Sequence, residues 1–284
     1  MRLWRIIRVF VAYKLLFMQI LIWLFEVYAS ALQKVRAQRC ALFFLPNFSI
    51  KTNHMADQTA TIIGSTGMIG TYLQQQLLED NYYSAVRILV RRPLPVTHEK
   101  LEVRLVNFDD LESVLVALYN SDVVFSCIGT TNKNVKGDKK LYWKIDHDIP
   151  VNACRLAKET GCGKFIMVSS TGANAKSGNF YIRLKGKTEE DVIATGMPEV
   201  HIMRPGMLLG NRKERRPAEK LMQAIMKPIS KVMVGRTRQF RAIEGADVAR
   251  AMVAASKLNN KGVHIYTYDD LMKLATAPST PSED

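Results

Sequence analysis

The chain has 284 residues, of which 48% are hydrophobic and 23% charged, a balance typical of soluble globular proteins with one large or two small domains. The formal net charge is +14, yet the sequence contains no zinc-finger, helix-turn-helix or RNA-binding aromatic motif, so nucleic acid is not expected as a partner. The four cysteines form no Cys-x-x-Cys pair, which predicts free thiols in a reducing compartment. Since no two Cys or His stand at ligand spacing, no metal site is predicted.

The first 54 residues carry half of the net charge, with eight Lys or Arg and one acid, Glu26. Apolar residues dominate positions 9–32, but Lys14 and Glu26 interrupt them, and a membrane-spanning helix needs about 20 predominantly apolar residues. Two interpretations stay open: a membrane-anchoring or interfacial helix, and a non-native extension upstream of a start at Met55. The predicted location is therefore cytoplasmic, with membrane contact through residues 1–32 under the first interpretation.

From Thr59 onward, short apolar runs alternate with longer segments of helical periodicity, which is the pattern of βαβ units. We predict an α/β fold with a single Rossmann-type, doubly wound parallel sheet and helices on both faces, spanning residues 55–275. Residues 276–284 are rich in Pro, Ser and Thr and are predicted to be a disordered tail. The predicted strands are 59–63, 86–90, 103–108, 123–127, 164–169, 200–204 and 263–268; the predicted helices are 68–79, one from 111, 141–158, 181–193, a basic helix-rich segment 212–231, and 246–257.

The loop after the first predicted strand has the sequence Gly64-Ser65-Thr66-Gly67-Met68-Ile69-Gly70. Glycines let a chain turn tightly and approach a pyrophosphate closely, while the following helix N-terminus offers free N–H groups and a positive dipole end. The Gly-Lys-Ser/Thr of a Walker loop is missing. A purely structural turn is the alternative, but the position between a strand and a helix favours a dinucleotide site formed by these seven residues.

The second predicted strand ends at Arg91 and Arg92, where NAD-specific folds place an acid for the ribose 2′-hydroxyl. Guanidinium groups match phosphate in bidentate fashion, so we predict NADP(H) as the cofactor. The alternative is a solvated surface pair. The ends of the third and fourth predicted strands supply further candidate cofactor contacts: Asn107 and Phe108 at the adenine, and Cys127, Ile128 and Gly129 beneath the middle of the cofactor.

Tyr181 and Lys185 stand four residues apart and share one face of a predicted helix. An ammonium near a phenol favours the phenolate and lowers the phenol pKa from about 10. This predicts Tyr181 as a general acid/base for carbonyl chemistry, with Lys185 also holding the nicotinamide ribose. Ser169 and Ser170 end the fifth predicted strand, as a cofactor contact and as the hydroxyl that orients the substrate oxygen. An amphipathic surface pair is the alternative for Tyr181 and Lys185.

Arg204, Pro205, Gly206 and Met207 follow the sixth predicted strand. Proline lacks an N–H and suits a strand terminus. The backbone that follows it is a candidate contact for the nicotinamide amide. A structural turn is an equal alternative for this segment.

Together these motifs resemble those of the atypical short-chain dehydrogenases, and most closely the Tat-interacting-protein-like oxidoreductases. The resemblance implies an NADP(H)-binding Rossmann fold with a Ser-Tyr-Lys centre, and it names no substrate. It covers nearly all of 55–270 and rests on Gly64-Ser65-Thr66-Gly67, Cys127-Ile128-Gly129-Thr130-Thr131, Val168-Ser169-Ser170-Thr171-Gly172-Ala173, Tyr181 to Lys185 with Gly186, and Arg204-Pro205-Gly206.

One residue departs from the pattern of related enzymes. Where many of them carry an Asn that supports a proton-relay water, this chain has Asp146. Either the acid takes over the role of the Asn, or the relay is absent. The neighbouring His147 is expected on a helix surface rather than as a catalytic base.

The sequence thus predicts an NADP(H)-dependent oxidoreductase acting on a small carbonyl substrate. The alternative is a catalytically weak, NADPH-sensing interaction protein. Its partner would bind the basic segment Arg212–Lys231, for which a substrate-covering lid is the preferred interpretation.

Overall fold

A computed structural model of the chain describes residues 58–209 and 235–277. The N-terminal extension and the basic segment Arg212–Lys231 lie outside the described residues, and so do the interpretations that depend on them. Within the described ranges, no helix is both long enough and apolar enough to cross a bilayer.

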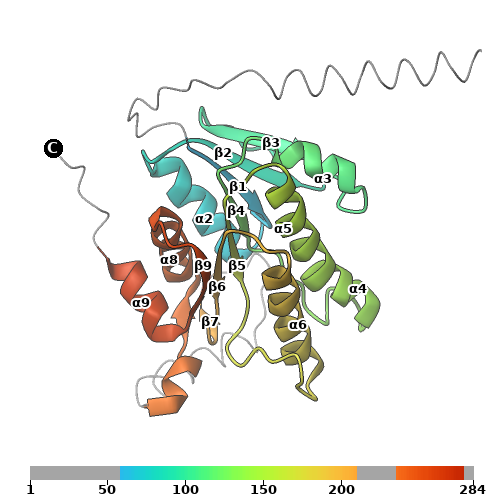
Figure 1. Ribbon diagram of the computed structural model, residues 1–284, viewed down its shortest axis with the longest axis vertical. Helices are drawn as coiled ribbons and strands as arrows, with labels where there is room; N and C mark the ends of the chain where they lie inside the picture. The colour runs from blue at the N-terminus through green and yellow to red at the C-terminus, as the bar shows by residue number, and fades with distance from the viewer. Residues whose placement is uncertain (1–57, 210–234, 278–284) are drawn as a thin grey trace, which may run out of the picture. The chain divides into compact units, whose positions relative to one another are not determined.

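Seven parallel strands form one central sheet, in the order β3-β2-β1-β4-β5-β6-β9 (Figure 1). The order reverses between β1 and β4, and ligands of doubly wound sheets bind at the carboxyl ends of the strands beside this point. The predicted fold class is confirmed. The strands are β1 (Gln58–Ile63), β2 (Tyr83–Val90), β3 (Leu101–Leu105), β4 (Val123–Ser126), β5 (Lys164–Val168), β6 (Glu199–Met203) and β9 (Gly262–Tyr266).

Helices cover both faces of the sheet, as Figure 1 shows. Neighbouring residues of a strand point to opposite faces, so Ile62 and Ile63, both fully buried, enter two separate cores. Full burial of an aliphatic side chain of this size stabilises the fold by about 1.5–3 kcal/mol. On the face of Ile62 lie α2 (Met68–Glu79), α8 (Gly245–Lys257) and α9 (Tyr268–Thr276); on the face of Ile63 lie α3 (Leu111–Leu118), α5 (Ile149–Glu159) and α6 (Phe180–Ala194).

The helix predicted over 141–158 is interrupted: α4 (Lys139–Trp143) leads into a π-helical turn, Lys144–Asp148, before α5 begins. Pro150 stands in the first turn of α5 and has no N–H for the carbonyl of Asp146, four residues earlier. That carbonyl instead accepts a hydrogen bond from Thr188 Oγ1 at 3.1 Å. π-Helical turns are rare and frequently occur at functional sites.

Several other boundaries differ from the sequence prediction, and helix α9 was not among the predicted helices. Strand β3 ends at Leu105, before Phe108. Strand β9 ends at Tyr266, because Thr267 and Asp270 form a capping box that starts α9. Helix α9 includes Thr276, the first residue of the predicted disordered tail, while residues 278–284 lie outside the described residues. A short parallel pair was not predicted at all: β7 (Leu208–Leu209) with β8 (Ile243–Glu244), joined in the described residues to a 3-10 helix over Gly235–Phe240.

Candidate functional site

The three glycines of the loop after β1 serve different purposes. Gly64 has a φ of +86°, and a Cβ on it would lie 2.8 Å from the Ile128 backbone nitrogen at the end of β4. A Cβ on Gly70 would lie 2.2 Å from the Gly64 carbonyl oxygen. Gly67 is exposed, has an ordinary φ of −76°, and would place a Cβ no closer than 3.3 Å to any heavy atom. Gly64 and Gly70 thus serve the protein's own packing, whereas Gly67 leaves space for a ligand.

Two further features of this loop fit a dinucleotide. Gly67 is the N-cap of α2, and no side chain caps the N–H groups of the first turn. These N–H groups lie at the positive end of the helix dipole. The hydroxyl of Ser65 is buried and has no hydrogen-bond partner within the described residues. An unsatisfied buried hydroxyl costs about 1–3 kcal/mol. Pyrophosphate oxygens would accept from both kinds of donor, so the residues present fit the group. Thr66, Met68 and Ile69 complete the loop.

Arg91 and Arg92 directly follow β2, at the same end of the sheet as the glycine loop. Both side chains are exposed, and neither forms an ion pair with another described residue. Because β2 is the neighbour of β1, these guanidinium groups stand beside the loop and are available to an anion.

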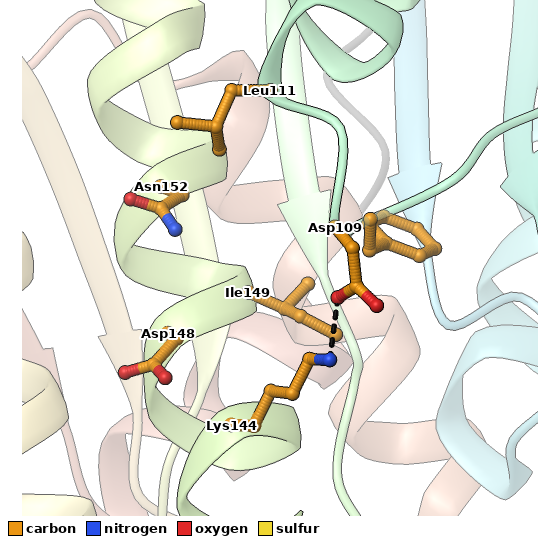
Figure 2. A pocket seen from close by; sticks show the side chains of 7 residues that line it. Asp109, Leu111, Lys144, Asp148, Ile149 and Asn152 are labelled. Carbon is orange, nitrogen blue, oxygen red and sulfur yellow. Dashed lines mark ion pairs between the residues drawn. The ribbon is translucent and has the colours of Figure 1, made fainter.

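A cavity of about 400 Å³ lies next to the carboxyl end of β3 (Figure 2). Phe108, a predicted adenine contact, is part of its wall. The ion pair between Asp109 and Lys144, 2.6 Å long, crosses the cavity at one side. Asn107 is exposed, and its side-chain oxygen accepts from the Asp109 N–H at 3.1 Å, which stabilises its own turn. The remaining wall is formed by Leu111, Asp148, Ile149 and Asn152.

The structure brings Tyr181 and Lys185 together and adds Asp146 to them. Lys185 Nζ lies 6.0 Å from the centre of the Tyr181 ring and 2.9 Å from Asp146 Oδ1. The other carboxylate oxygen of Asp146 accepts from the Thr130 N–H at 2.7 Å. Lys185 and Asp146 are buried, whereas Tyr181 is 37% exposed. The buried ion pair of Lys185 and Asp146 thus lies beneath the phenol of Tyr181, which reaches solvent.

Two opposing effects set the pKa of Lys185. Burial lowers it, but the charges of Asp146, Tyr181 and Glu189 outweigh burial, so the pKa is raised and the ammonium stays protonated. The carboxylate of Asp146 also offsets much of the field that the ammonium exerts on Tyr181. Asp146 therefore holds Lys185 in place and at the same time reduces its pull on the phenol.

The two serines after β5 have different environments. Ser169 is buried, and its hydroxyl donates to Glu189, whose carboxylate also accepts from Arg204 Nε at 3.0 Å. Ser170 is half-buried, and the only hydrogen bond of its hydroxyl within the described residues is a long one of 3.4 Å to the Thr171 carbonyl. Of the two, Ser170 is therefore the hydroxyl available to a substrate.

Glu189 links Ser169 to Arg204, and sequence reasoning missed it. Its signal was nevertheless present, because Glu189 follows Lys185 by four residues and so shares its helix face. Ser169 and Arg204, both predicted as cofactor contacts, are therefore connected through the carboxylate of Glu189. Arg204 keeps a quarter of its side chain exposed.

The segment after Arg204 is held by backbone hydrogen bonds. The Pro205 carbonyl accepts from the Thr171 N–H at 3.0 Å, and the Met207 carbonyl accepts from the Ile243 N–H at 2.9 Å. A Cβ on Gly206 would lie 2.4 Å from the Arg241 carbonyl oxygen. These contacts explain the conformation of the segment as a structural turn. Its contact with the nicotinamide stays a prediction.

The residues after β4 connect the glycine loop with the group formed by Tyr181, Lys185 and Asp146. Burial raises the pKa of Cys127 to about 12, so its thiol stays protonated. Its N–H donates to the Ile63 carbonyl at 2.8 Å. A Cβ on Gly129 would lie 3.5 Å from Asp146 Oδ1, so this glycine adjoins the Lys185–Asp146 pair.

His147 lies away from this site. Its ring nitrogens contact the carboxylates of Asp148 at 2.7 Å and Asp191 at 2.8 Å, which links the π-helical turn to α6. Its side chain is only 12% exposed, which differs from the helix-surface position expected for it, and its lack of a catalytic role stays a prediction.

Comparison with known proteins agrees with this geometry. Residues 64–258 match a family described as NAD(P)H-binding. Protein FMP52, mitochondrial, of Debaryomyces hansenii is 36% identical over 200 residues, covering 69% of this chain and 86% of that protein. Protein HTATIP2 of Rattus norvegicus is 32% identical over 168 residues, covering 58% of this chain and 69% of that protein.

Solved structures share the fold at low sequence identity. UDP-N-acetylglucosamine 4-epimerase from Methanobrevibacter ruminantium has a TM-score of 0.56 at 19% identity, over 75% of this chain and 77% of that one. MoeE5 in complex with UDP-glucuronic acid and NAD has a TM-score of 0.57 at 16% identity, over 73% and 75%. With the family match and the curated relatives, the chain is established as a member of the NAD(P)H-binding, atypical short-chain dehydrogenase/reductase family.

Proposed function

We propose that the protein is an NADP(H)-dependent oxidoreductase that acts on a carbonyl or alcohol substrate. The observation that carries the proposal is the buried Lys185–Asp146 pair beneath the half-exposed Tyr181, at the same end of the sheet as the glycine loop. The cofactor, when bound, supplies or accepts the hydride.

Three residues of the chain divide the remaining work. Tyr181 gives its phenolic proton to the substrate oxygen, or takes it back in the reverse direction. Ser170 Oγ donates a hydrogen bond to the same oxygen and so orients the carbonyl. Lys185, fixed by Asp146, holds the nicotinamide ribose with its ammonium and stabilises the phenolate that forms at Tyr181.

The role of Tyr181 is tested by Tyr181→Phe, which removes only the hydroxyl. In a screen of carbonyl compounds with NADPH, we expect kcat/KM for any turned-over compound to fall by at least about 100-fold, the usual contribution of a general acid. The NADPH Kd should stay unchanged. Tyr119→Phe, at an exposed tyrosine after α3, is the matched control. Equal activity of the two variants would contradict the proposed role.

The preference for NADP(H) rests on Arg91 and Arg92, the two exposed guanidinium groups after β2. The double variant Arg91→Ala with Arg92→Ala should weaken NADPH binding far more than NADH binding, because only NADPH carries the 2′-phosphate. Arg155→Ala, on the outer surface of α5, controls for the loss of surface charge. Equal weakening of both cofactors would falsify the 2′-phosphate role.

A second candidate is an NADPH-sensing protein with weak catalysis. Asp146 favours it, since this carboxylate offsets the charge by which Lys185 would activate Tyr181. The sensor is supported if no compound is turned over while a protein partner binds only when NADPH is present. A cytoplasmic location stays a prediction, to be tested by cell fractionation, since the relative FMP52 carries "mitochondrial" in its name.

A further inference from the structure

Two segments, one running from the loop after β4 into the first turn of α4 and the other the loop after β5, carry five exposed lysines without a carboxylate partner in the part of the chain that the structure describes. We call Lys133, Lys136, Lys139, Lys140 and Lys176 the lysine rim. Most other described lysines are occupied. Lys144, Lys164, Lys185, Lys187 and Lys257 pair with carboxylates, and Lys100 and Lys158 donate to backbone carbonyls. Lys261 and Lys273 are exposed like the rim, but Lys261 lies directly before β9 and Lys273 lies in α9.

The loop after β4 presents its lysines from a fixed position. Val135, in the middle of the loop, is 3% exposed and packs with Tyr142 and Leu184. The backbone turns back on itself through hydrogen bonds such as Gly137 N–H to the Asn132 carbonyl at 3.0 Å. Lys136 adopts a φ of +51°, a left-handed conformation that is uncommon for a residue with a side chain. The packing of Val135 and these hydrogen bonds thus fix the backbone from which the lysines of this loop extend.

Both loops lie against the start of α6, the helix that carries Tyr181. Lys139 Nζ lies 5.7 Å from the ring centre of Phe180, the residue before Tyr181. The loop after β5 is fastened to the same helix. Asn174 donates its N–H to the Ile182 carbonyl at 3.1 Å, and Arg183 Nη1 donates to the Ser177 carbonyl at 2.7 Å. The segments that carry the rim therefore pack against the start of α6, the helix on which Tyr181 stands.

The positive charge of the rim is not balanced locally. Asp138 is the only acid in these two loops, and its carboxylate caps α4 by accepting from the N–H groups of Lys140 and Leu141. Like charges held close together repel one another, and a positively lined site concentrates anions and speeds their arrival. Lysine binds phosphate as a point charge.

We propose that the lysine rim binds a phosphate group of the substrate that reacts at Tyr181. This inference rests on the proposed function and specifies it, because it names phosphorylated carbonyl compounds as the substrate class. Two sources share this chemistry, a soluble phosphorylated metabolite and a phospholipid headgroup.

The test compares dihydroxyacetone phosphate with dihydroxyacetone by calorimetry on the full chain. The protein is saturated with NADP⁺ so that the cofactor's own phosphate sites are filled. We expect the phosphorylated probe to bind at least about tenfold more tightly, and Lys133→Gln with Lys136→Gln and Lys176→Gln to remove about tenfold of its affinity. The matched control is Lys261→Gln with Lys273→Gln, which should leave both affinities unchanged.

A vesicle arm separates the two sources of phosphate. Binding to phosphatidylcholine vesicles is measured with and without phosphatidic acid, for the wild type and for both lysine variants. Rim-dependent binding to the soluble probe or to phosphatidic acid supports the inference and identifies the source. Absence of rim dependence in both arms, or equal losses in the rim and control variants, overturns it. If phosphate binding depends on the rim while no compound is turned over, the proposed function fails but phosphate recognition by the rim stands.

Discussion

Strand β6 carries a buried charged network at each of its ends. At the amino end, Glu199 accepts from His201 Nε2 at 2.7 Å and pairs with Lys164 at 3.2 Å, while His201 Nδ1 contacts Tyr266 Oη at 2.9 Å. At the carboxyl end, Arg204 pairs with Glu189, which also accepts from Ser169. Each network is built around one glutamate, but the other members and the surroundings differ.

The difference lies in what each network leaves accessible. His201 is fully buried, and its two ring nitrogens both have partners, so the amino-end network is complete within the protein. In the carboxyl-end network, the charge of Glu189 helps to raise the pKa of Lys185, and Arg204 keeps a quarter of its side chain exposed. We therefore expect the closed amino-end network to serve stability, whereas the open carboxyl-end network leaves a guanidinium accessible at the end of the sheet where doubly wound folds place their ligands.

The largest expected effect concerns the buried pair at the open end. Asp146→Ala leaves Lys185 buried without a counter-ion, and we expect the free energy of unfolding to fall by about 3–5 kcal/mol. Denaturant unfolding measures this loss. Glu159→Ala, which removes one partner of the exposed Arg155–Glu159 pair, should cost at most about 1 kcal/mol. A similar small loss for Asp146→Ala would mean that water already reaches Lys185.

The next effect separates packing from ligand binding within the glycine loop. Gly70→Ala places a Cβ against the Gly64 carbonyl and should cost about 1–3 kcal/mol of stability. Gly67→Ala should cost much less stability but weaken NADPH binding, because its Cβ enters the space left for the ligand. Thermal unfolding and NADPH titration of both variants measure the two effects. Wild-type NADPH affinity in Gly67→Ala would remove this glycine from the cofactor site.

The smallest effect appears at the closed end as a dependence on pH. Burial lowers the pKa of His201, and Lys164 and His264 add to this against the opposing effect of Glu199. The folded state thus favours the neutral ring, so stability is complete above the unfolded pKa of about 6.5 and is lost as the pH falls below it. One proton gives a slope of at most about 1.4 kcal/mol per pH unit.

Unfolding between pH 5 and 8 measures this slope in the wild type and in His201→Gln, which should be flatter. His98→Gln, at an exposed histidine, should keep the wild-type slope. If His201→Gln retains the full slope, the acid sensitivity arises from other groups than the amino-end network.

The sequence predicted those parts of the site that depend on neighbours along the chain. The helix over 68–79 and the glycine loop before it were placed correctly, because glycine spacing and apolar periodicity are local signals. The pairing of Lys185 with Asp146 joins residues 39 positions apart in sequence, on two elements whose contact depends on tertiary packing. The π-helical turn shifts Asp146 relative to a regular helix, and periodicity alone does not reveal such a shift.

The close contact between Gly64 and Ile128 divides the loop after β4 into two parts that are expected to differ in their tolerance of substitution. Its inner part, Cys127 to Gly129, is confined by the glycine loop on one side and by Asp146 on the other. Its outer part, from 131 to 138, is anchored through Val135 and displays the remaining side chains to solvent. Substitution of the exposed outer residues is therefore expected to leave the packing of Gly64 and the surroundings of Asp146 unaltered.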